Sequence, residues 1–368
     1  MFWHLILTDE CNLCCSYCRA KAFEPCSEPA QQFAYDPDLP VDLAVVPDEL
    51  ATFLARDPDP TLTFYGGEPL LRADLVNDVM ARVSNCRFML QTNGLLLDRL
   101  SPDLLQRFHT VLVSIDGPES LTDRHRGAGV YARVLANVER MIDAGFHGEL
   151  IARMTVDEAT DIETAVLHCD SLPFSGVHWQ IDANFWGDYF RRDFGSWVER
   201  SYNPGIRRLV ESWVERIEAG QVLRWYPFLD TTEDLLAERS SLLRCGSGHA
   251  NYTIQTDGRI VPCPTMTGMP DFYLGHIGNS DPLHLPRVPV EGDCVGCDIV
   301  SFCGGRCLYS AVTEPWPAEY RAVVCGTVRC LHEALHLALP RVRVALDNGT
   351  VSPADFAHVK YNGCEIIP

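Results

Sequence analysis

The segment TDECNLCCSYCRAK, near the start of the chain, concentrates cysteines directly after an apolar run, FWHLILT. Its four cysteines are Cys11, Cys14, Cys15 and Cys18. The first, third and fourth have the spacing C-x3-C-x2-C, and three thiolates on one short loop can hold a cubane iron–sulfur cluster whose fourth iron is open to a reactant. Cys14 offers a second register, C-x2-C-x3-C, but Tyr17 and the helix-like CRAKAF favour Cys15. Zinc is the alternative metal, although three thiolates without a fourth ligand suit it poorly.

A second group of cysteines begins more than two hundred residues further along this chain of 368 residues and 16 cysteines. It follows the pattern C-x12-G-x4-C, C-x2-C-x5-C-x3-C, C, formed by Cys245, Gly258, Cys263, Cys294, Cys297, Cys303, Cys307 and Cys325. Clustered thiols in a chain without an export signal indicate metal ligands rather than disulfides. The two groups therefore predict two or more metal sites in two domains, with a pair of zinc ribbons as the alternative for the second half.

Charge and hydropathy exclude several classes of function. The formal net charge is −20, and the only lysines are Lys21 and Lys360, which argues against nucleic acid as a partner. The apolar N-terminal run is too short to span a membrane and lacks the basic region and cleavage site of a signal peptide. We therefore expect a cytoplasmic protein without membrane association.

Strand-like and helix-like segments alternate through the first half of the chain. The apolar runs WHLILT, TLTFY, RFMLQT, TVLVSI, LIARMTV and VHWQID are separated by amphipathic patterns such as YARVLANVERMIDAG. About six such units predict an α/β fold with a parallel sheet, right-handed crossovers and helices outside the sheet. In such sheets ligands bind at the carboxyl ends of the strands.

Small and polar residues follow the second, third and fourth of these strands or lie within the fifth. They are Gly66, Gly67, Glu68, Asn93, Ser114, Asp116 and Arg153. The two glycines allow a close backbone approach, and the glutamate supplies a fixed carboxylate. The segment GGEP alone could simply open a helix. Repetition of such residues at one rim of one sheet favours a ligand site.

The cysteine loop and this rim resemble the radical S-adenosylmethionine (SAM) enzymes. The resemblance implies a partial (β/α)6 barrel in which Cys11, Cys15 and Cys18 hold a [4Fe–4S] cluster with SAM at its open iron. It also implies contacts to the amino group of SAM from Gly66, Gly67 and Glu68, to the ribose from Asn93, Ser114 and Asp116, to the carboxylate from Arg153, and to the adenine from Tyr17.

The C-terminal pattern resembles the SPASM domain, a small cysteine-rich domain of radical SAM enzymes that mature peptides and proteins. The resemblance implies two auxiliary [4Fe–4S] clusters. The outer cluster would be held by Cys294, Cys297, Cys303 and Cys325, and the inner cluster by Cys245, Cys263 and Cys307. The segment NYTIQTDGRIVPC independently predicts a β-hairpin that turns at Asp257 and Gly258.

Two ligand positions of these clusters stay open at this point. Asn251 stands where some relatives have a further cysteine that completes the inner cluster. His249, Cys364, or a thiolate or carboxylate of the substrate could take its place. Cys330 competes with Cys325 for the outer cluster, but it lies in the amphipathic pattern VRCLHEALHLAL, which favours a core position.

These motifs predict that the chain is organised in four parts. They are a radical SAM partial barrel at 1–200, a helical bridge at 201–243, a SPASM domain at 244–330, and a C-terminal helix and tail at 331–368. The bridge includes a helix from about Pro204 to Ala219. Aromatic residues in and beside it could line a substrate channel or seat one domain on the other; they are Trp197, Trp213, Trp225 and Tyr226. Trp179 and Asp182, at the sixth strand, could face a substrate.

The resemblance implies an enzyme that acts on a peptide or protein, similar to the maturases of ribosomally made peptides (RiPPs) and more weakly to an archaeal putative peptide-modifying group. An external donor such as ferredoxin or flavodoxin would reduce the first cluster. Reductive cleavage of SAM would give a 5′-deoxyadenosyl radical that abstracts hydrogen from a side chain or α carbon. A cross-link, for example a thioether, or an oxidation would follow.

Three other functions are weighed against this one. A sulfatase-type maturase would oxidise Cys or Ser to formylglycine and needs a base, for which Asp182 is the candidate. An iron–sulfur electron carrier would not need the polar rim, and a zinc-stabilised binding protein would hold no iron. Because the chain starts directly at its first strand, we expect recognition of the peptide by the barrel mouth, the acidic surface or a separate protein.

Overall fold

The computed structural model describes residues 1–18, 34–185, 187–362 and 367. The chain forms two compact units, each assembled from several segments. The first unit consists of Met1–Ile115, Thr122–Ala152 and Gly246–Pro289, and the second of Asp116–Leu121, Arg153–Cys245 and Val290–Pro368. Helix α5 (Glu119–Arg126) and strand β5 (Glu149–Val156) run from one unit into the other.

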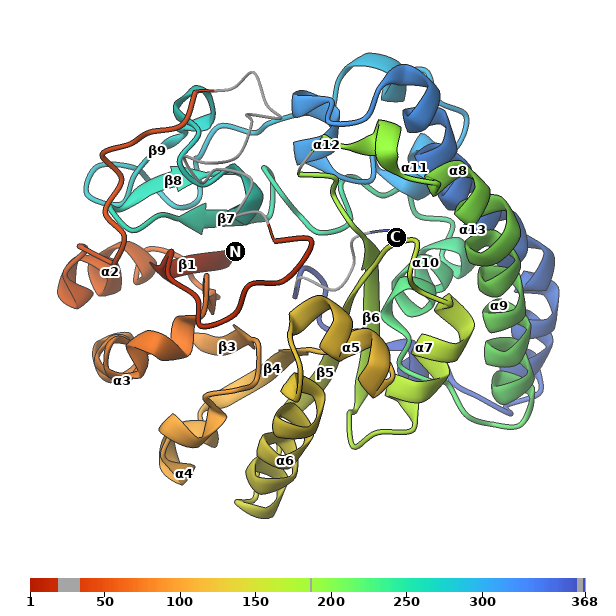
Figure 1. The fold of residues 1–368 in the computed structure, drawn as a ribbon, viewed down its shortest axis with the longest axis horizontal. Helices are drawn as coiled ribbons and strands as arrows, with labels where there is room; N and C mark the ends of the chain where they lie inside the picture. The colour runs from red at the N-terminus through yellow and green to blue at the C-terminus, as the bar shows by residue number, and fades with distance from the viewer. Residues whose placement is uncertain (19–33, 186, 363–366, 368) are drawn as a thin grey trace. The chain divides into compact units, whose positions relative to one another are not determined.

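A largely parallel sheet forms the core of the first unit (Figure 1). Its strands are β1 (Phe2–Thr8), β2 (Thr61–Gly66), β3 (Arg87–Thr92), β4 (Phe108–Ser114), β7 (Asn251–Ile254), β8 (Arg259–Val261) and β9 (Gly275–His276). They lie in the order β4-β3-β2-β1-β7-β8-β9, and only the last two pairings are antiparallel. All of β1 except its first residue is buried, as expected for a parallel strand covered on both faces.

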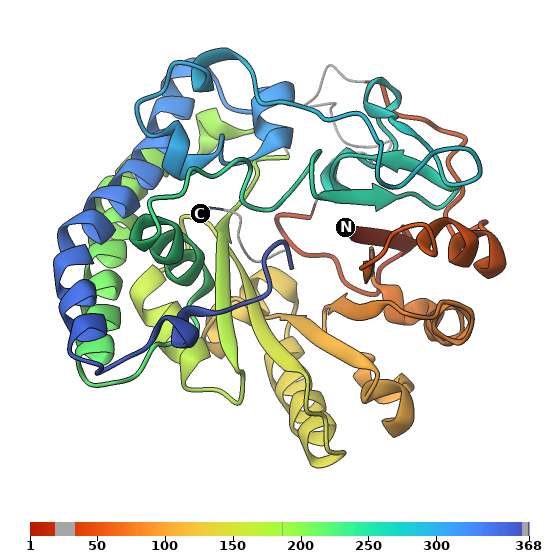
Figure 2. The same ribbon diagram turned by 180° about the vertical axis from the view of Figure 1, so that it is seen from behind.

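Strand β1 pairs with two segments that are far apart in the sequence. Leu5 is in register with Phe64 of β2 and with Ile254 of β7. The predicted hairpin is confirmed: β7 and β8 are antiparallel, and Gly258 has a φ of 89° at the turn. Because β7 extends the sheet beside β1, residues 246–289 group with the first unit, and the units differ from the four predicted ranges (Figure 2).

The helices of the first unit follow the local patterns of the sequence. They are α2 (Pro47–Leu54), α3 (Ala73–Arg82), α4 (Pro102–Leu105) and α6 (Val130–Asp143), with 3-10 turns at Pro69–Arg72, Leu97–Arg99, Pro264–Met266 and Pro270–Phe272. The Ser101 side chain caps α4 by accepting a hydrogen bond from Leu104 N at 3.3 Å. In α6, Val130, Val134 and Val138 are buried at the spacing of one helix face.

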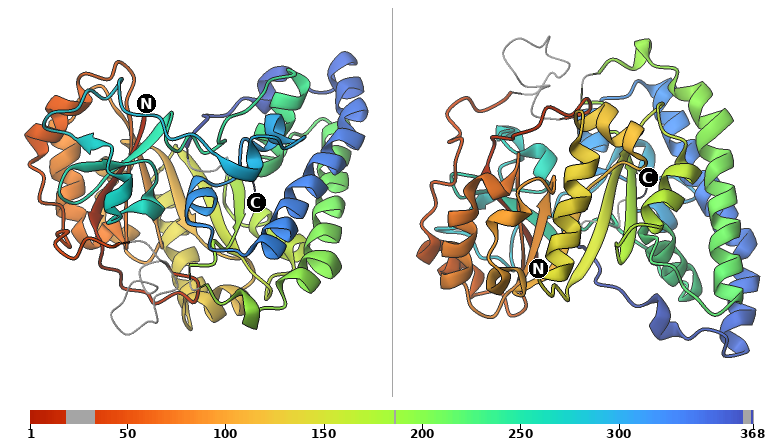
Figure 3. Two further views of the ribbon diagram at one scale, coloured as in Figure 1. Left: turned by 90° about the horizontal axis from the view of Figure 1, so that it is seen from above. Right: turned by 60° about the horizontal axis from the view of Figure 1, so that its bottom comes forward.

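The second unit contains β6 (Gly176–Ile181), which lies next to β5, and a group of helices. They are α7 (Ile162–Asp170), α8 (Phe194–Trp197), α9 (Asn203–Glu218), α10 (Tyr226–Leu236), α11 (Val300–Cys303), α12 (Leu308–Thr313) and α13 (Ala318–Asp347), with a π turn at Val198–Tyr202 and 3-10 turns at Tyr189–Arg191, Gly292–Cys294 and Pro353–Phe356. Helices α9 and α13 run side by side (Figure 3), and Arg341 pairs with Glu211 at 2.6 Å and with Glu218 at 2.7 Å.

The aromatic residues of the bridge are core residues rather than parts of an open channel. Trp213, Trp225 and Tyr226 are fully buried, and Trp197 is nearly so. Trp179 is also fully buried and packs edge-on against Phe228, with ring centroids 5.2 Å apart. It therefore packs inward instead of facing a substrate.

Helix α13 begins earlier than the predicted C-terminal helix and carries both Cys325 and Cys330. By length and composition it is apolar enough to cross a membrane, with 44% of its most apolar window buried inside the structure. It also packs on α9, and core helices of many proteins pass the same test.

Candidate functional site

The first cysteine loop is fastened to the end of β2 through the backbone. Gly67 N donates to Thr8 O and Glu68 N donates to Glu10 O, both at 2.8 Å. A Cβ on Gly66 would overlap the Thr8 carbonyl, and one on Gly67 would overlap the Glu10 carbonyl. The two glycines are therefore required because the strand end and the loop approach too closely for any side chain.

Glu68 joins the end of β2 to the end of β3. The residue is fully buried, and its Oε1 accepts hydrogen bonds from Leu70 N at 3.0 Å and Thr92 Oγ1 at 2.7 Å. Its Oε2 accepts from Asn93 N at 2.7 Å. Burial raises the pKa of Glu68 to about 7, although these hydrogen bonds oppose the shift. The carboxylate thus positions the QTNG turn, and its predicted contact with an amino group of SAM stays a prediction.

Asn93 in turn reaches the cysteine loop. Its Nδ2 donates to Asn12 Oδ1 at 2.7 Å and lies 3.8 Å from Cys11 Sγ. Cys11 is exposed as a residue, but desolvation of its sulfur raises the pKa of the thiol to about 11. The negative charges of Glu68, Cys15 and Cys18 act in the same direction, so the structure brings the three predicted ligands near one another. A cationic cluster at these sulfurs would offset that repulsion.

A pair of residues from α5 holds the same loop and was missed from the sequence. His125 Nδ1 lies 2.8 Å from Ser16 Oγ, and Ser16 N donates to the His125 carbonyl at 3.0 Å. The Tyr17 ring lies 5.4 Å from the His125 ring, and the Arg126 guanidinium lies 5.6 Å from the Tyr17 ring centroid. Both basic residues are buried. The segment DRHRG shows no local pattern that would have identified them.

Two rim residues lie in the second unit. Asp116 is fully buried, and its Oδ1 accepts from Thr155 N at 3.1 Å. Arg153 donates through Nη2 to Gln180 Oε1 at 3.0 Å, and its buried Nε has no hydrogen-bond partner among the described residues. Ser114, at the end of β4 in the first unit, is half-buried.

Asp182, the predicted base, is buried in an ion pair. Its Oδ2 lies 2.6 Å from Arg192 Nη1, and its Oδ1 accepts from Asn184 N at 3.0 Å. Arg192 also makes a two-point contact with Glu158 at 2.8 and 2.9 Å. Burial raises the pKa of Asp182, while the Arg192 charge opposes that shift. Proton transfer to Asp182 would therefore have to disrupt this pair, which weakens its candidacy.

Four C-terminal cysteines lie near one another in the second unit. They are the predicted outer-cluster ligands, Cys294, Cys297, Cys303 and Cys325. Burial raises the pKa of the Cys303 thiol to about 11, and the charges of Cys294 and Cys325 add to that shift. Arg329 Nη2 lies 3.6 Å from Cys297 Sγ. In the described part of the chain no three His, Cys, Asp or Glu side chains converge on a single metal ion.

The structure distinguishes Cys325 from Cys330, the two candidate outer-cluster ligands on α13. Cys330 is buried and lies 3.6 Å from the Asn203 carbonyl, so it belongs to the contact between α13 and the start of α9. Cys325 is exposed, and its negative charge raises the pKa of the Cys294 and Cys303 thiols, so it lies near both. This arrangement supports Cys325 as the outer-cluster ligand.

The predicted inner-cluster ligands divide between the units. Cys245 and Cys307 belong to the second, and Cys263 belongs to the first, where its Sγ lies 3.0 Å from Thr265 Oγ1.

The candidate replacements for a fourth inner ligand lie in different settings. Asn251 is buried in β7, with its Oδ1 2.9 Å from His4 Nδ1. His249 Nδ1 lies 3.4 Å from the Ser247 carbonyl, and burial lowers the pKa of His249. Cys364 lies outside the described residues.

Comparison with known proteins supports this assignment of the first half. Residues 5–165 match the model of the Radical SAM superfamily and form a radical SAM domain. The AdoMet-dependent heme synthase of Nitratidesulfovibrio vulgaris is 26% identical over 187 residues, 48% of this chain and 46% of that protein. The GTP 3',8-cyclase of Corynebacterium glutamicum (strain R) is 32% identical over 176 residues, 44% of this chain and 43% of that protein. The matches thus span less than half the length of these relatives.

Solved structures match nearly the whole chain. Polyhistidine-tagged anSMEcpe with bound AdoMet has a TM-score of 0.71 at 18% identity and covers 95% of this chain and 99% of that chain. Streptococcus suis SuiB bound to S-adenosylmethionine has a TM-score of 0.52 at 14% identity, with 83% of this chain and 72% of that chain covered. At these identities the likeness establishes the predicted α/β fold.

Proposed function

We propose that the protein is a radical SAM enzyme that modifies a peptide or protein. The observation that carries this proposal is the C-x3-C-x2-C loop, held at the carboxyl ends of β1, β2 and β3 inside a radical SAM domain. Gly67 and Glu68 fasten that loop, and Asn93 reaches it from β3. An electron carrier would not need such a polar rim around its thiols.

The residues present suit SAM and its cluster. Cys11, Cys15 and Cys18 would hold a [4Fe–4S] cluster, because the three sulfurs are gathered on one loop and their thiolate forms, which disfavour one another, would be stabilised by a cationic cluster. In the second unit, the buried Nε of Arg153 lacks a partner among the described residues, and a carboxylate such as that of SAM would satisfy it. Tyr17, Ser114 and Asp116 complete the proposed contacts to the adenine and ribose.

When bound, the cluster would supply the electron that cleaves SAM to a 5′-deoxyadenosyl radical. The chain's own contribution is placement. Glu68 fixes the turn after β3, His125 fixes the loop at Ser16 and Tyr17, and the Thr155 amide fixes Asp116. Groups held rigidly before the reaction begins lower the entropic part of its barrier.

The C-terminal cysteines are proposed to form a SPASM domain with two auxiliary [4Fe–4S] clusters. The outer cluster takes the four neighbouring thiols of the second unit, Cys294, Cys297, Cys303 and Cys325. The inner cluster takes Cys245, Cys263 and Cys307, and its fourth ligand would be His249, Cys364 or a group of the substrate. These clusters would accept the electron left on the substrate after hydrogen abstraction, or bind the substrate directly.

A peptide substrate is favoured over a small molecule because of how much of the chain each comparison covers. The curated relatives named for heme and GTP chemistry match less than half of this chain. Native anSMEcpe with bound AdoMet and Cp18Cys peptide matches 94% of it, with a TM-score of 0.66 and 17% identity. The products would be cross-links such as thioethers or oxidised side chains. A ferredoxin- or flavodoxin-like donor, a separate peptide-recognition protein and a cytoplasmic location complete the proposal.

The test is anaerobic iron and sulfide quantification on reconstituted protein, with 5′-deoxyadenosine release from SAM under dithionite. We expect about twelve irons per chain and deoxyadenosine formation. Cys15→Ala should lose about four irons and all deoxyadenosine, whereas Cys14→Ala, the matched control one position away, should keep both. Bound zinc, little iron and no deoxyadenosine would overturn the proposal.

A second candidate is oxidation of a Cys or Ser residue to formylglycine; the likeness to anSMEcpe with a bound peptide supports a peptide substrate for either reaction. Mass spectrometry of a peptide in which Cys is the candidate target, incubated with the loaded enzyme, distinguishes the two products. A thioether cross-link removes two hydrogens and leaves the sulfur in place. Formylglycine formation from Cys replaces the thiol with an aldehyde, and Asp182→Asn should abolish that reaction if Asp182 is its base.

A further inference from the structure

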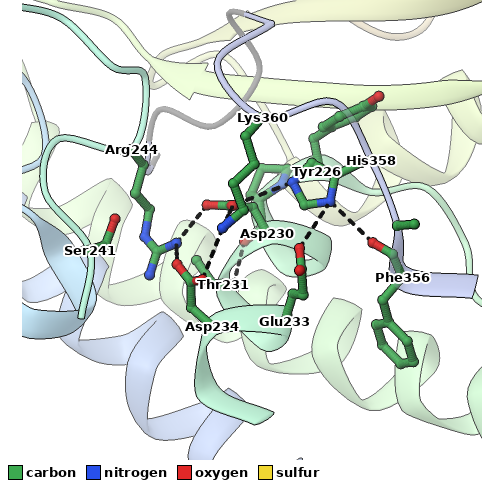
Figure 4. A network of polar contacts seen from close by, with 12 residues as sticks. Tyr226, Asp230, Thr231, Glu233, Asp234, Ser241, Arg244, Phe356, His358 and Lys360 are labelled. Carbon is green, nitrogen blue, oxygen red and sulfur yellow. Dashed lines mark hydrogen bonds and ion pairs between the residues drawn. The ribbon is translucent and has the colours of Figure 1, made fainter. Parts of the chain in front are cut away.

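A buried ionic network in the second unit lies outside every residue assigned above. Asp230 and Asp234 stand one turn apart on α10, and both are buried. Arg244 Nη1 lies 2.6 Å from Asp230 Oδ2 and 2.8 Å from Asp234 Oδ2 (Figure 4). The Arg244 side chain itself is 1% exposed, so one buried cation joins two buried carboxylates.

Lys360 Nζ lies 2.9 Å from Asp234 Oδ1 and 3.3 Å from Asp230 Oδ1. His358 Nε2 lies 3.3 Å from Asp230 Oδ1, and the His358 side chain is completely buried. Each carboxylate therefore lies between the tail and Arg244 (Figure 4), and Asp234 Oδ1 also pairs with the half-exposed Arg239 at 2.9 Å.

Arg244 is placed between two segments that carry predicted cluster ligands. It directly precedes Cys245, and its Nε donates to the carbonyl of Phe302, the residue before Cys303, at 2.8 Å. The guanidinium also lies 5.2 Å from the Phe302 ring centroid.

Backbone contacts also join the segment before Cys245 to the segment that carries Cys303. Ser241 N donates to Ser301 O at 2.7 Å. A Cβ on Gly304 would overlap the Leu242 carbonyl, so the two segments approach at backbone distance. The position of the Cys245 segment therefore depends on the position of Arg244.

We propose that the C-terminal tail is a positioning element for the auxiliary clusters, acting through Asp230, Asp234 and Arg244 on the segments that carry Cys245 and Cys303. The inference rests on the proposed function, because it concerns the clusters assigned there. Lys360 and His358 orient the two carboxylates, the carboxylates orient Arg244, and Arg244 sets the separation of the two ligand segments. Loss of the Lys360 charge removes a cation that contacts both carboxylates, and leaves His358 beside Asp230 and the half-exposed Arg239 beside Asp234 on that side.

The experiment compares reconstituted wild-type protein with Lys360→Met, Lys360→Arg and Arg341→Met. Arg341 is the matched control, since it also pairs with two carboxylates of the second unit but does not touch this network. Iron per chain is measured together with the electron paramagnetic resonance spectrum of the reduced clusters, before and after addition of SAM. The melting temperature of each apoprotein is recorded as well.

We expect Lys360→Met to fall from about twelve irons per chain to about eight and to lose one auxiliary-cluster signal. The signal that responds to SAM should persist, and Lys360→Arg and Arg341→Met should match the wild type. Unchanged iron and spectra in Lys360→Met would overturn the inference. A uniform loss of all clusters with a lower apoprotein melting temperature would also overturn it, because it would mean general destabilisation.

Different results would overturn the inference and the proposed function. A wild-type protein with only about four irons would remove the auxiliary clusters, and the inference with them. A wild-type protein with about twelve irons, and a Lys360→Met variant with the same number, would overturn the inference alone.

Discussion

The two cysteine regions of this protein are held in place by different kinds of interaction. The N-terminal loop is fixed by backbone hydrogen bonds, by glycines at close approach and by one buried carboxylate, Glu68. The segment before Cys245 is fixed by a buried ionic network centred on Arg244. We expect the first arrangement to be sensitive to added volume and the second to a change of charge. Each region should therefore fail under a different class of substitution.

The largest expected effect comes from removing the central cation of the second region. Arg244→Met removes the buried cation that joins Asp230 and Asp234, and breaking such a buried pair costs about 3–5 kcal/mol. Chemical denaturation of the apoprotein should show this loss as a lower midpoint. Arg239→Met, which removes a half-exposed cation from Asp234, is the control and should cost about 1 kcal/mol or less. Equal losses in the two variants would contradict a special role for Arg244.

A volume change should break the first region instead. Gly67→Ala places a methyl group onto the Glu10 carbonyl and should cost about 3 kcal/mol of unfolding free energy and about four irons per chain. Gly326→Ala is the matched control, since a Cβ there meets no other described atom within 4 Å. In helix α13 that control should be neutral or stabilising by about 1 kcal/mol. If Gly67→Ala kept its iron, the close approach would not matter to the cluster.

The two regions should also respond oppositely to pH. The folded pKa of Glu68 is raised from 4.5 to about 7, so its contribution to stability is full below pH 4.5 and is lost as pH rises through about 7. The pKa of Asp230 is lowered in the folded protein, against its burial, by His358, Arg244 and Lys360. Its contribution is therefore present above pH 3.8, its unfolded pKa, and is lost as pH falls below that value.

The variant Glu68→Gln tests whether Glu68 causes the pH dependence of the first region. Denaturation of the apoprotein between pH 5 and 8 should show wild-type stability falling by roughly 2 kcal/mol more than that of Glu68→Gln. Asp230→Asn should leave that slope unchanged. Parallel slopes for the wild type and Glu68→Gln would mean that Glu68 is not the group that titrates.

The smallest effect is expected at the surface of the second region. Arg341→Met removes two partly exposed ion pairs between α13 and α9 and should cost about 0.5–1 kcal/mol. That loss should shrink in 1 M salt, because exposed pairs are screened. The loss from Arg244→Met, a buried pair, should persist in salt.

The parts of the site that the sequence predicts are those encoded by local spacing. The cysteine loop, the glycines after β2 and the hairpin at Gly258 each depend on a few neighbouring residues, and the structure places them as expected. The helix predicted from about Pro204 is also present, as α9. Periodicity and turn chemistry are local properties, which explains this agreement.

The parts that escaped prediction depend on contacts between distant residues. Nothing near His125 indicates that it contacts Ser16, which is 109 positions away. Likewise, Lys360 looks like an ordinary tail residue until Asp234 is found beside it, 126 positions away. The aromatic residues of the bridge were equally compatible with a channel or a core, because composition does not reveal which face is covered.

The pairing of β1 with both β2 and β7 has a consequence for how the protein is made. During synthesis β1 and β2 emerge early, but β7 follows more than two hundred residues after β1. At ribosomal rates of about 5–20 residues per second this delay lasts roughly 10–50 s. Throughout that interval one edge of a strongly apolar strand has no partner and can join a neighbouring nascent chain. Slow translation, low temperature and chaperones that shield strand edges should therefore govern the yield of folded protein more than its final stability does.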